Sequence, residues 1–386
     1  MRVRPFRRVP QHKGSRAWKW HQQESDEFEP FESRLRKGLW CPPRLRGRDA
    51  SVIEEVNDWY FAMLHDRQRN DFYWSALGRL VKGKRVVDIG AGCGLLSLMA
   101  ARLGAESVLA VEASREMCTL ARLNLQRNGL ADTVRVVNSW SCDVALPPQE
   151  RADVVVSETL GTLLLGECAH LHLSDARKRL AKPDAVVVPA CGTQFARLVM
   201  SPSLASLSAA PPPEACHGFD LSATNALQDT AGLYFTKDRG VRLSSLTDLT
   251  AMSQSIPLFS AEFGVTEPHD IPRSMTFQVE AKHSGVVHAV VTTWEAEAPG
   301  GGGPVLSTDY ESTRGQPWGF FRDMQWGQGI QLVEDFDAAP RLASRGAAPP
   351  PVPFQVVEGE RLALTVRLSH PDRMSIQFRL QRARDQ

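Results

Sequence analysis

Residues 85–94 have the sequence RVVDIGAGCG, in which a short run of β-branched residues leads into a turn with three glycines. The run predicts a buried strand, and the turn predicts a tight connection to a helix over residues 95–105. Glycine has no Cβ, so the backbone of such a turn can approach a ligand closely. The stretch therefore predicts a strand–turn–helix unit with a ligand site at the turn.

Strands and helices continue to alternate on both sides of this unit. Further strands are predicted at SVLAVEA (107–113), TVRVVNS (133–139) and ADVVVSE (152–158), and helices at 54–80, 114–130 and 174–184. Strands that alternate with helices form parallel sheets with crossover connections. We therefore expect an α/β Rossmann-like domain.

The pattern changes after about Pro189, where short β-like segments follow one another with little helix between them. They are FARLVM (195–200), TFQVEA (276–281), VVHAVVTTW (286–294), GIQLV (329–333), RLALTVRL (361–368) and SIQFRL (375–380). Stretches rich in Pro or Gly at 208–218, 298–304 and 346–353 predict exposed loops. This pattern is typical of an antiparallel sandwich or barrel.

Composition limits the class of protein. The 386 residues suit two domains, and the near balance of 45 basic and 44 acidic residues disfavours a dedicated nucleic-acid binder. The basic N-terminal stretch predicts a solvated tail, with weak electrostatic docking as the alternative. No apolar run is long enough for a membrane span, and no signal-peptide core is present. The seven Cys form no CxxC pair, which indicates reduced intracellular thiols and no metal site.

The glycine turn also carries carboxylates that suggest its ligand. Asp88 precedes the glycines, where it would repel a pyrophosphate but suit the cationic amino-acid end of S-adenosylmethionine. Glu112 ends the second strand, where a carboxylate can accept both ribose hydroxyls. The alternative is a tight turn with no ligand. The predicted cofactor-binding set is Asp88, Gly90, Gly92, Gly94, Glu112, Ala113, Ser141 and Cys142, the last two placed to meet the adenine.

A second motif follows the fourth strand, where Glu158 and Glu167 bracket an apolar loop with two glycines. A hairpin there would bring both carboxylates to one spot, and their repulsion would be relieved by a bound guanidinium. Arginine offers five N–H donors in a planar fork, which two carboxylates can hold. The alternative is that Glu158 caps a helix and Glu167 is a surface acid.

From about Glu54 onwards, these motifs together resemble the protein arginine methyltransferases. The resemblance implies that Glu158 and Glu167 are the catalytic glutamates of a double-glutamate loop, with Glu158 also near the cofactor. It implies that Arg69, within MLHDRQRN (63–70), pairs with the cofactor carboxylate. It also implies that MQWGQ (324–328) corresponds to the family's Thr-His-Trp loop, with Gln325 and Trp326 binding substrate. Packing in the β-barrel core is the alternative for Trp326.

MLHDRQRN, NSWSCDV (138–144) and TLLLGE (162–167) most resemble the type 7 class, which makes monomethylarginine only. Gln325 and Met324 replace the family's usual His and Thr, which puts a second methyl transfer in doubt. The resemblance implies a homodimer formed through an arm at about 201–260, with apolar patches including Leu233, Tyr234, Phe235 and Phe259. It also implies arginine-containing acceptors such as RNA-binding proteins or histones, without direct binding of nucleic acid.

The expected organisation is therefore a tail at 1–40, a cofactor-binding domain at 41–188 and a β-barrel substrate domain at 189–386. The cytoplasm is the expected compartment, with the nucleus as a second one. S-adenosylhomocysteine would be the second product, and no metal would be needed. The alternatives are a dimethylating enzyme, a methyltransferase acting on RNA or a small molecule, and a scaffold that kept the fold without the activity.

Overall fold

The computed structural model describes residues 43, 60–338, 349–369 and 375–383. Residues 58–386 belong to one compact unit, and the expected N-terminal tail at 1–40 lies outside the described residues. The change from parallel to antiparallel strands falls between β5 (Ala181–Val188) and β6 (Cys191–Met200), at the predicted Pro189.

A parallel sheet of five strands has the order β3-β2-β1-β4-β5. Its other strands are β1 (Arg85–Ile89), β2 (Ser107–Glu112), β3 (Val134–Asn138) and β4 (Ala152–Ser157). The strand order reverses between β1 and β4, which pair with Ile89 opposite Ser157. In open α/β sheets, ligands bind outside the carboxyl ends of the strands at such a reversal. The glycine turn after β1 and Glu158 after β4 are therefore neighbours.

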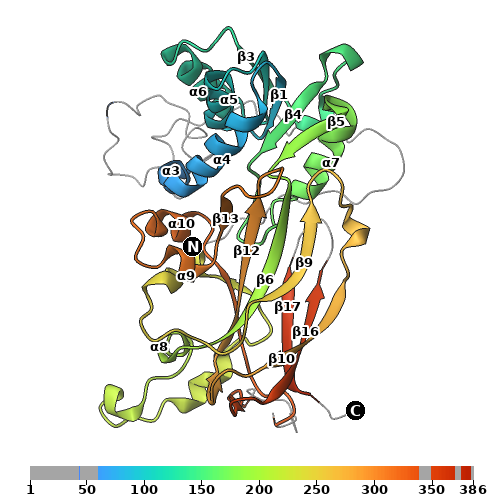
Figure 1. The fold of residues 1–386 in the computed structure, drawn as a ribbon. Helices are drawn as coiled ribbons and strands as arrows, with labels where there is room; N and C mark the ends of the chain where they lie inside the picture. The colour runs from blue at the N-terminus through green and yellow to red at the C-terminus, as the bar shows by residue number, and fades with distance from the viewer. Residues whose placement is uncertain (1–42, 44–59, 339–348, 370–374, 384–386) are drawn as a thin grey trace. The chain divides into compact units, whose positions relative to one another are not determined.

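Helices cover both faces of this sheet (Figure 1). On one face α5 (Leu95–Arg102) and α6 (Arg115–Arg127) pack against β2 and β3, and on the other α7 (Ala169–Leu180) packs against β4 and β5. Ser114 caps α6 by accepting a hydrogen bond from the Met117 amide, and Gly129 follows its end with a φ of +68°. The Rossmann-like arrangement predicted from the alternating pattern is confirmed.

Two predicted helices have different limits. The helix predicted over 54–80 is broken within its described part into α3 (Tyr60–His65) and α4 (Arg67–Leu80), because Asp66 leaves the helical conformation and caps α4 through the Arg69 amide. The helix predicted over 174–184 ends at Leu180. Pro183 cannot continue a helix but is tolerated in β5, an edge strand of the sheet.

The rest of the chain forms antiparallel sheets. The largest is built on β6, β12 (Ala289–Glu297), β9 (Ile256–Glu262) and β14 (Gly329–Leu332), and its smaller strands are β7 (Tyr234–Phe235), β8 (Thr250–Ala251) and β13 (Val305–Ser307). A second sheet contains β10 (Ser274–Glu280), β16 (Arg361–Leu368) and β17 (Ile376–Arg382), and β11 (Gly285–Val287) pairs with β15 (Phe354–Val356). Alternate residues of β16 and β17 are buried, which explains the period-two sequence pattern.

Short helices follow β6, where the arm was predicted, and two more precede β14. They are α8 (Pro202–Ser206), η4 (Pro213–Cys216), η5 (Ser222–Leu227), η6 (Thr236–Arg239), η7 (Leu243–Ser245), α9 (Tyr310–Thr313) and α10 (Gly319–Gln325). The predicted apolar patch is wrong at Phe259, which is buried in β9. Leu233, Tyr234 and Phe235 are half-buried and pack partly against the chain's own core, and β7 pairs with β14 of the main sheet. The exposed apolar side chains of the segment are Leu207, Phe219, Leu221 and Leu227.

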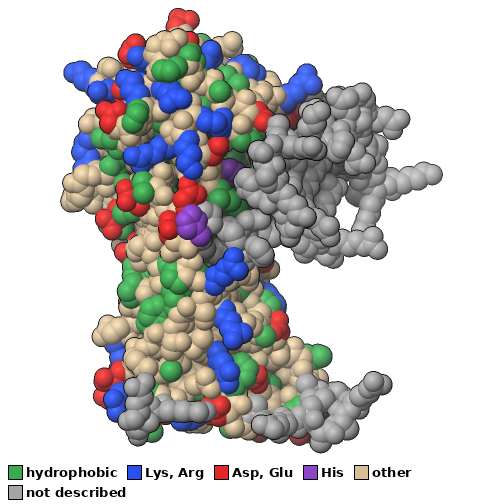
Figure 2. Space-filling model, turned by 90° about the vertical axis from the view of Figure 1, so that its right-hand side faces the viewer, with side chains coloured by type: hydrophobic (Ala, Val, Ile, Leu, Met, Phe, Trp, Pro, Cys, Tyr) green, Lys and Arg blue, Asp and Glu red, His purple; other side chains and the backbone are tan. Residues whose placement is uncertain are grey.

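The surface gives two further observations. No helix of the described residues is long and apolar enough to cross a membrane. On the face shown in Figure 2, Lys and Arg side chains are interspersed with Asp and Glu. That distribution matches the nearly balanced charge of the whole sequence.

Candidate active site

The glycine turn between β1 and α5 has a backbone that only glycine adopts easily. Gly90, Gly92 and Gly94 have φ values of +72°, +55° and +88°. A Cβ on Gly92 would lie 3.1 Å from the hydroxyl oxygen of Tyr60, which accepts a hydrogen bond from the Cys93 amide at 3.0 Å. Tyr60 on α3 therefore covers the turn, and the turn forms a cradle that side chains would fill.

Asp88 lies fully buried beneath this cradle. One carboxylate oxygen accepts a hydrogen bond from the Ser97 hydroxyl at 2.7 Å, while the other has no partner among the described residues. Burial raises the pKa of Asp88 to about 7, against the effect of the Ser97 hydrogen bond, and the charge of Glu112 raises it further. A buried acceptor without a donor is costly, so this oxygen fits a cationic or N–H donor of a ligand.

Glu112 holds the edge of the same cradle from the end of β2. Its two oxygens accept hydrogen bonds from the amides of Gly92 and Ser114, each at 2.8 Å. The carboxylate is thereby fixed with lone pairs left over for ligand hydroxyls. Ala113 and Cys142 are exposed beyond it, and Ser141 is half-buried, its carbonyl accepting a hydrogen bond from Arg179.

Arg69 and Glu158 form a nearly buried ion pair between α4 and the end of β4. Both Nε and Nη2 of Arg69 donate to the same Glu158 oxygen, at 3.0 and 2.7 Å. Burial raises the pKa of Glu158, and the guanidinium opposes that shift. The other Glu158 oxygen has only a long contact of 3.4 Å to the Leu160 amide, so it remains available to a ligand. The alternative prediction of a helix cap is wrong, since Glu158 precedes a loop.

The loop from Glu158 to Glu167 closes on itself through its glycines. A Cβ on Gly161 would lie 3.3 Å from the Gly166 Cα and 3.2 Å from the Leu163 carbonyl oxygen. The indole N–H of Trp326 donates to the Leu160 carbonyl at 2.7 Å, and that of Trp294 donates to the Gly161 carbonyl at 2.9 Å. Two tryptophans of the antiparallel region thus fix the loop.

Glu167 stands at the other end of this loop. Its side chain is exposed to solvent, although many protein atoms surround it. Desolvation raises its pKa to about 7, the charge of Glu158 adds to the shift, and the charge of Lys237 opposes it. Among the described residues it has no hydrogen-bond or ion-pair partner, so the loop offers a second unoccupied carboxylate close to Glu158.

The loop that contains Gln325 and Trp326 closes the site from the side of α10. The Gln325 amide lies 3.5 Å from Glu158 Oε2, and its buried carbonyl oxygen has no partner among the described residues. Trp326 is buried and packs edge-on against Trp294, with ring centroids 4.8 Å apart. The structure therefore favours packing for Trp326, and Gln325 is the residue of this loop whose side chain reaches Glu158.

Two residues of the site were missed by the motifs. Tyr60 belongs to none of the motifs, and its position over the glycine turn depends on the break at Asp66. Lys237 lies in η6, where the sequence carries no recognisable pattern. A cation is expected near two glutamates, but the sequence does not show that Lys237 is the cation that meets them.

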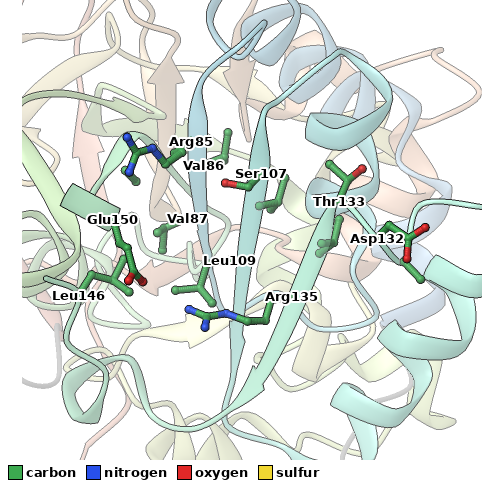
Figure 3. Close-up of a pocket in the computed structure, with 14 residues that line it drawn as sticks. Arg85, Val86, Val87, Ser107, Leu109, Asp132, Thr133, Arg135, Leu146 and Glu150 are labelled. Carbon is green, nitrogen blue, oxygen red and sulfur yellow. The ribbon is translucent and has the colours of Figure 1, made fainter. Parts of the chain in front are cut away.

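The described residues also contain a cavity away from these motifs. No group of three or more His, Cys, Asp or Glu side chains there is arranged to hold a metal ion. A cavity of about 520 Å³ lies against the amino-terminal parts of β1, β2 and β3, between Arg85, Glu150 and Arg135 (Figure 3). It is at the opposite end of the strands from the glycine turn and holds none of the predicted site residues.

Comparison with known proteins agrees with this geometry. Residues 74–188 match the family described as ribosomal protein L11 methyltransferase (PrmA). The chain is 31% identical over 337 residues to protein arginine N-methyltransferase 7 of Danio rerio, an alignment that covers 83% of this chain and 45% of the relative. It is 30% identical over 286 residues to the protein of that name from Drosophila melanogaster, covering 68% and 40%. The chain thus spans less than half the length of these curated relatives.

Solved structures share the fold. One is the Trypanosoma brucei PRMT1 enzyme–prozyme heterotetrameric complex with AdoHcy, with a TM-score of 0.66 at 21% identity over 85% of this chain and 94% of that one. Another is an open conformation of Arabidopsis thaliana protein arginine methyltransferase 10, with a TM-score of 0.63 at 19% identity and the same coverage. These similarities show a Rossmann-like methyltransferase sheet followed by antiparallel sheets.

Proposed function

Because this chain is homologous to the protein arginine N-methyltransferases over most of its length, we propose that it transfers a methyl group from S-adenosylmethionine to a guanidinium nitrogen of arginine in proteins. The observation that carries the proposal is the loop in which Glu158 and Glu167 lie close to each other. One oxygen of Glu158 and both oxygens of Glu167 are available to the five N–H donors of a guanidinium.

The fixed parts of the site suit the cofactor. The three glycines form its cradle, the free oxygen of Asp88 suits its ammonium group, and Glu112 suits its ribose hydroxyls. Arg69, which faces Glu158, would hold its carboxylate, and Ser141, Cys142 and Ala113 would border the adenine. When bound, the cofactor supplies a methyl group on a sulfonium centre. It needs no metal.

The chain's own residues then position the acceptor. Arginine keeps its proton, because its pKa lies above about 12. Glu158 and Glu167 would bind two of its nitrogens, draw the positive charge toward themselves and leave the third nitrogen as the nucleophile. Holding reactants in this way contributes roughly 7–11 kcal/mol in favourable cases. Glu167, with its pKa raised to about 7, is suited to take the proton that the methylated nitrogen loses.

The acceptor class is tested by transfer of tritiated methyl groups to arginine-containing peptides, with matched peptides in which lysine replaces arginine. Label on the arginine peptides alone supports the proposal. Label on RNA or small molecules would favour another class of methyltransferase. The similarity to the PrmA family does not decide the acceptor, because it covers only residues 74–188, which hold the cofactor motifs. Binding of cofactor without transfer to any acceptor would indicate a scaffold.

We also propose that the product is monomethylarginine and that the acceptors are proteins such as RNA-binding proteins or histones, in the cytoplasm and nucleus. The product proposal is supported by Gln325 beside Glu158, in the place where the arginine methyltransferases carry a histidine. Imaging of the tagged chain tests the location, and labelling in cell extract tests the acceptors.

A homodimer is part of the proposal. Leu207, Phe219, Leu221 and Leu227 are exposed on the inserted segment, and Trp74, Leu120 and Leu123 are exposed on α4 and α6. Two different sets of exposed apolar side chains, one on each element group, suit a head-to-tail contact between copies. Light scattering at micromolar concentration should give a dimer, and Phe219→Asp should give a monomer. A monomeric unmodified chain would refute this part of the proposal.

A further inference from the structure

Lys237 connects the inserted segment to the candidate acceptor site. Its ammonium group donates to the Gln325 carbonyl at 3.1 Å. The preceding Thr236 is fully buried and forms two hydrogen bonds with Gln328. The Thr236 amide donates to the Gln328 carbonyl at 2.9 Å, and the Gln328 amide donates to the Thr236 hydroxyl at 2.8 Å. The η6 helix is therefore fixed against the loop that carries Gln325.

Gly327 makes this close packing possible. Its φ is +57°, and a Cβ there would lie 2.5 Å from the Thr236 hydroxyl oxygen and 3.3 Å from the Lys237 amide nitrogen. Any other residue would push η6 away from the loop. The approach of Lys237 to the site is thus a consequence of the backbone on both sides of the contact.

The charges of the site then balance in two pairs. Arg69 binds Glu158 directly, so its charge compensates that carboxylate. Within the described part of the chain, two charged groups act on Glu167, Glu158 from the end of β4 and Lys237 from η6. Lys237 forms no direct ion pair with Glu167 in this structure, yet its charge acts on it, and the neighbouring Asp238 acts on Lys237 in turn. Without Lys237, the charge that the described residues leave acting on Glu167 would be the like charge of Glu158.

We propose that Lys237 is a charge-tuning residue of the acceptor site, which extends the ionised range of Glu167 to lower pH before the acceptor binds and so sets the lowest pH at which arginine is accepted. The proposal rests on the proposed function of the site. It adds a cation from the inserted segment to the two glutamates. The cost is some repulsion of the incoming guanidinium, which changes little with pH because both groups stay cationic. At high pH, where Glu167 is ionised without help, only this cost remains.

The sign of the effect follows from the charges. Burial and Glu158 raise the pKa of Glu167, and Lys237 lowers it. Removing the ammonium must therefore raise that pKa further. As the pH falls, Glu167 is then protonated at a higher pH than in the unmodified chain. An opposite charge within about 4–6 Å commonly lowers a carboxyl pKa by 1–3 units, and we expect about one unit here because no direct contact is made.

The test measures kcat/KM against pH for an arginine peptide, since this ratio follows the ionisation of the free enzyme. In the plot of kcat/KM against pH, the acid limb is the range over which the ratio rises with pH. For Lys237→Gln and Lys237→Met this limb should shift to higher pH by about one unit, so that kcat/KM at a given acid pH falls about tenfold. At high pH the ratio should stay the same or rise. Lys237→Arg should restore the original limb.

Arg239→Gln is the matched control. Arg239 lies on the same helix, but its guanidinium stacks on the Tyr234 ring at 4.0 Å and is not among the charges that shift the pKa of Glu167. Its removal takes away one positive charge from η6 and should leave the limb in place. An equal shift in this variant would mean that the general charge of the segment, and not Lys237, sets the limb.

A merely structural Lys237 gives a different result. If it only anchors the Gln325 loop, Lys237→Met lowers kcat at every pH and leaves the limb unmoved, which would overturn the proposal. Calorimetric binding of the same peptide in the presence of S-adenosylhomocysteine gives a second readout over pH. A chain that binds the peptide with the expected shift but transfers no methyl group would refute the proposed function and keep the role of Lys237.

Discussion

Asp66 and Arg322 form an ion pair in which both side chains are completely buried, although they are separated by 256 positions in the sequence. Asp66 also caps α4 through the Arg69 amide at 3.0 Å, and Arg322 lies on α10 three residues before Gln325. Arg322 donates further to Gln68 at 2.8 Å and to the Ser307 carbonyl. The pair therefore joins the helix that carries Arg69 to the helix that leads into the Gln325 loop.

Breaking this pair should destabilise the fold strongly. Arg322→Met leaves the Asp66 carboxylate buried without a cation, which typically costs about 3–5 kcal/mol. Denaturant unfolding measures the loss. The control is Arg67→Met, which removes an exposed pair with Asp71 of 3.6 Å beside the same helix start and should leave stability unchanged. Equal losses in the two variants would contradict the importance of the buried pair.

Glu112→Ala should weaken binding of S-adenosylhomocysteine by about tenfold to a hundredfold, because hydrogen bonds to a charged group contribute roughly 1.5–3 kcal/mol. Isothermal calorimetry measures the affinity. Asn138→Ala controls for loosening of the turn, since its side chain binds the carbonyls of Glu112 and Ala113 without reaching the cradle. Unchanged affinity in Glu112→Ala would remove Glu112 from the ribose site.

Glu167 should reduce the stability of the fold at neutral and alkaline pH. Its pKa is raised from 4.5 to about 7 in the folded chain, so between these values the folded state binds more protons than the unfolded state. Stability then falls as pH rises through this window. Glu167→Gln should raise Tm above pH 7 and change it little below 4.5. Glu106→Gln, at an exposed turn, should do neither, and a Glu167→Gln difference that does not depend on pH would contradict the raised pKa.

The parallel sheet could be predicted because its signals are local. Each strand is a short β-branched run, each helix has its own period, and the glycines at 90, 92 and 94 are required by positive φ values. Parallel strands that end at one edge then bring Gly90, Glu112 and Glu158 together without any further information. The roles of Arg69 and Gln325, in contrast, came from the resemblance to known motifs.

The remaining contacts depend on long-range packing that no local pattern contains. Lys237 meets the Gln325 loop across 88 positions through a segment with little regular structure, so neither periodicity nor spacing could place it. The apolar residues Leu233 and Phe235 were predicted to face a partner, but both pack partly against the chain's own core, Phe235 through the pairing of β7 with β14. An apolar side chain in an irregular segment fits either position equally well before the fold is known.

The grip of Glu158 and Glu167 on the guanidinium should also decide the product. The unmodified enzyme should make monomethylarginine, because a methyl group removes one N–H donor and leaves a lone pair of Glu158 or Glu167 unpaired in the occupied site. Gln325, at 3.5 Å from Glu158, cannot take a proton to relieve this. Glu167→Asp shortens the side chain by one methylene and should admit a methylated nitrogen, so mass spectrometry of its product peptide should show dimethylarginine. Glu106→Asp should not change the product. Abundant dimethylarginine from the unmodified enzyme would overturn the monomethylating assignment while leaving arginine methylation itself intact.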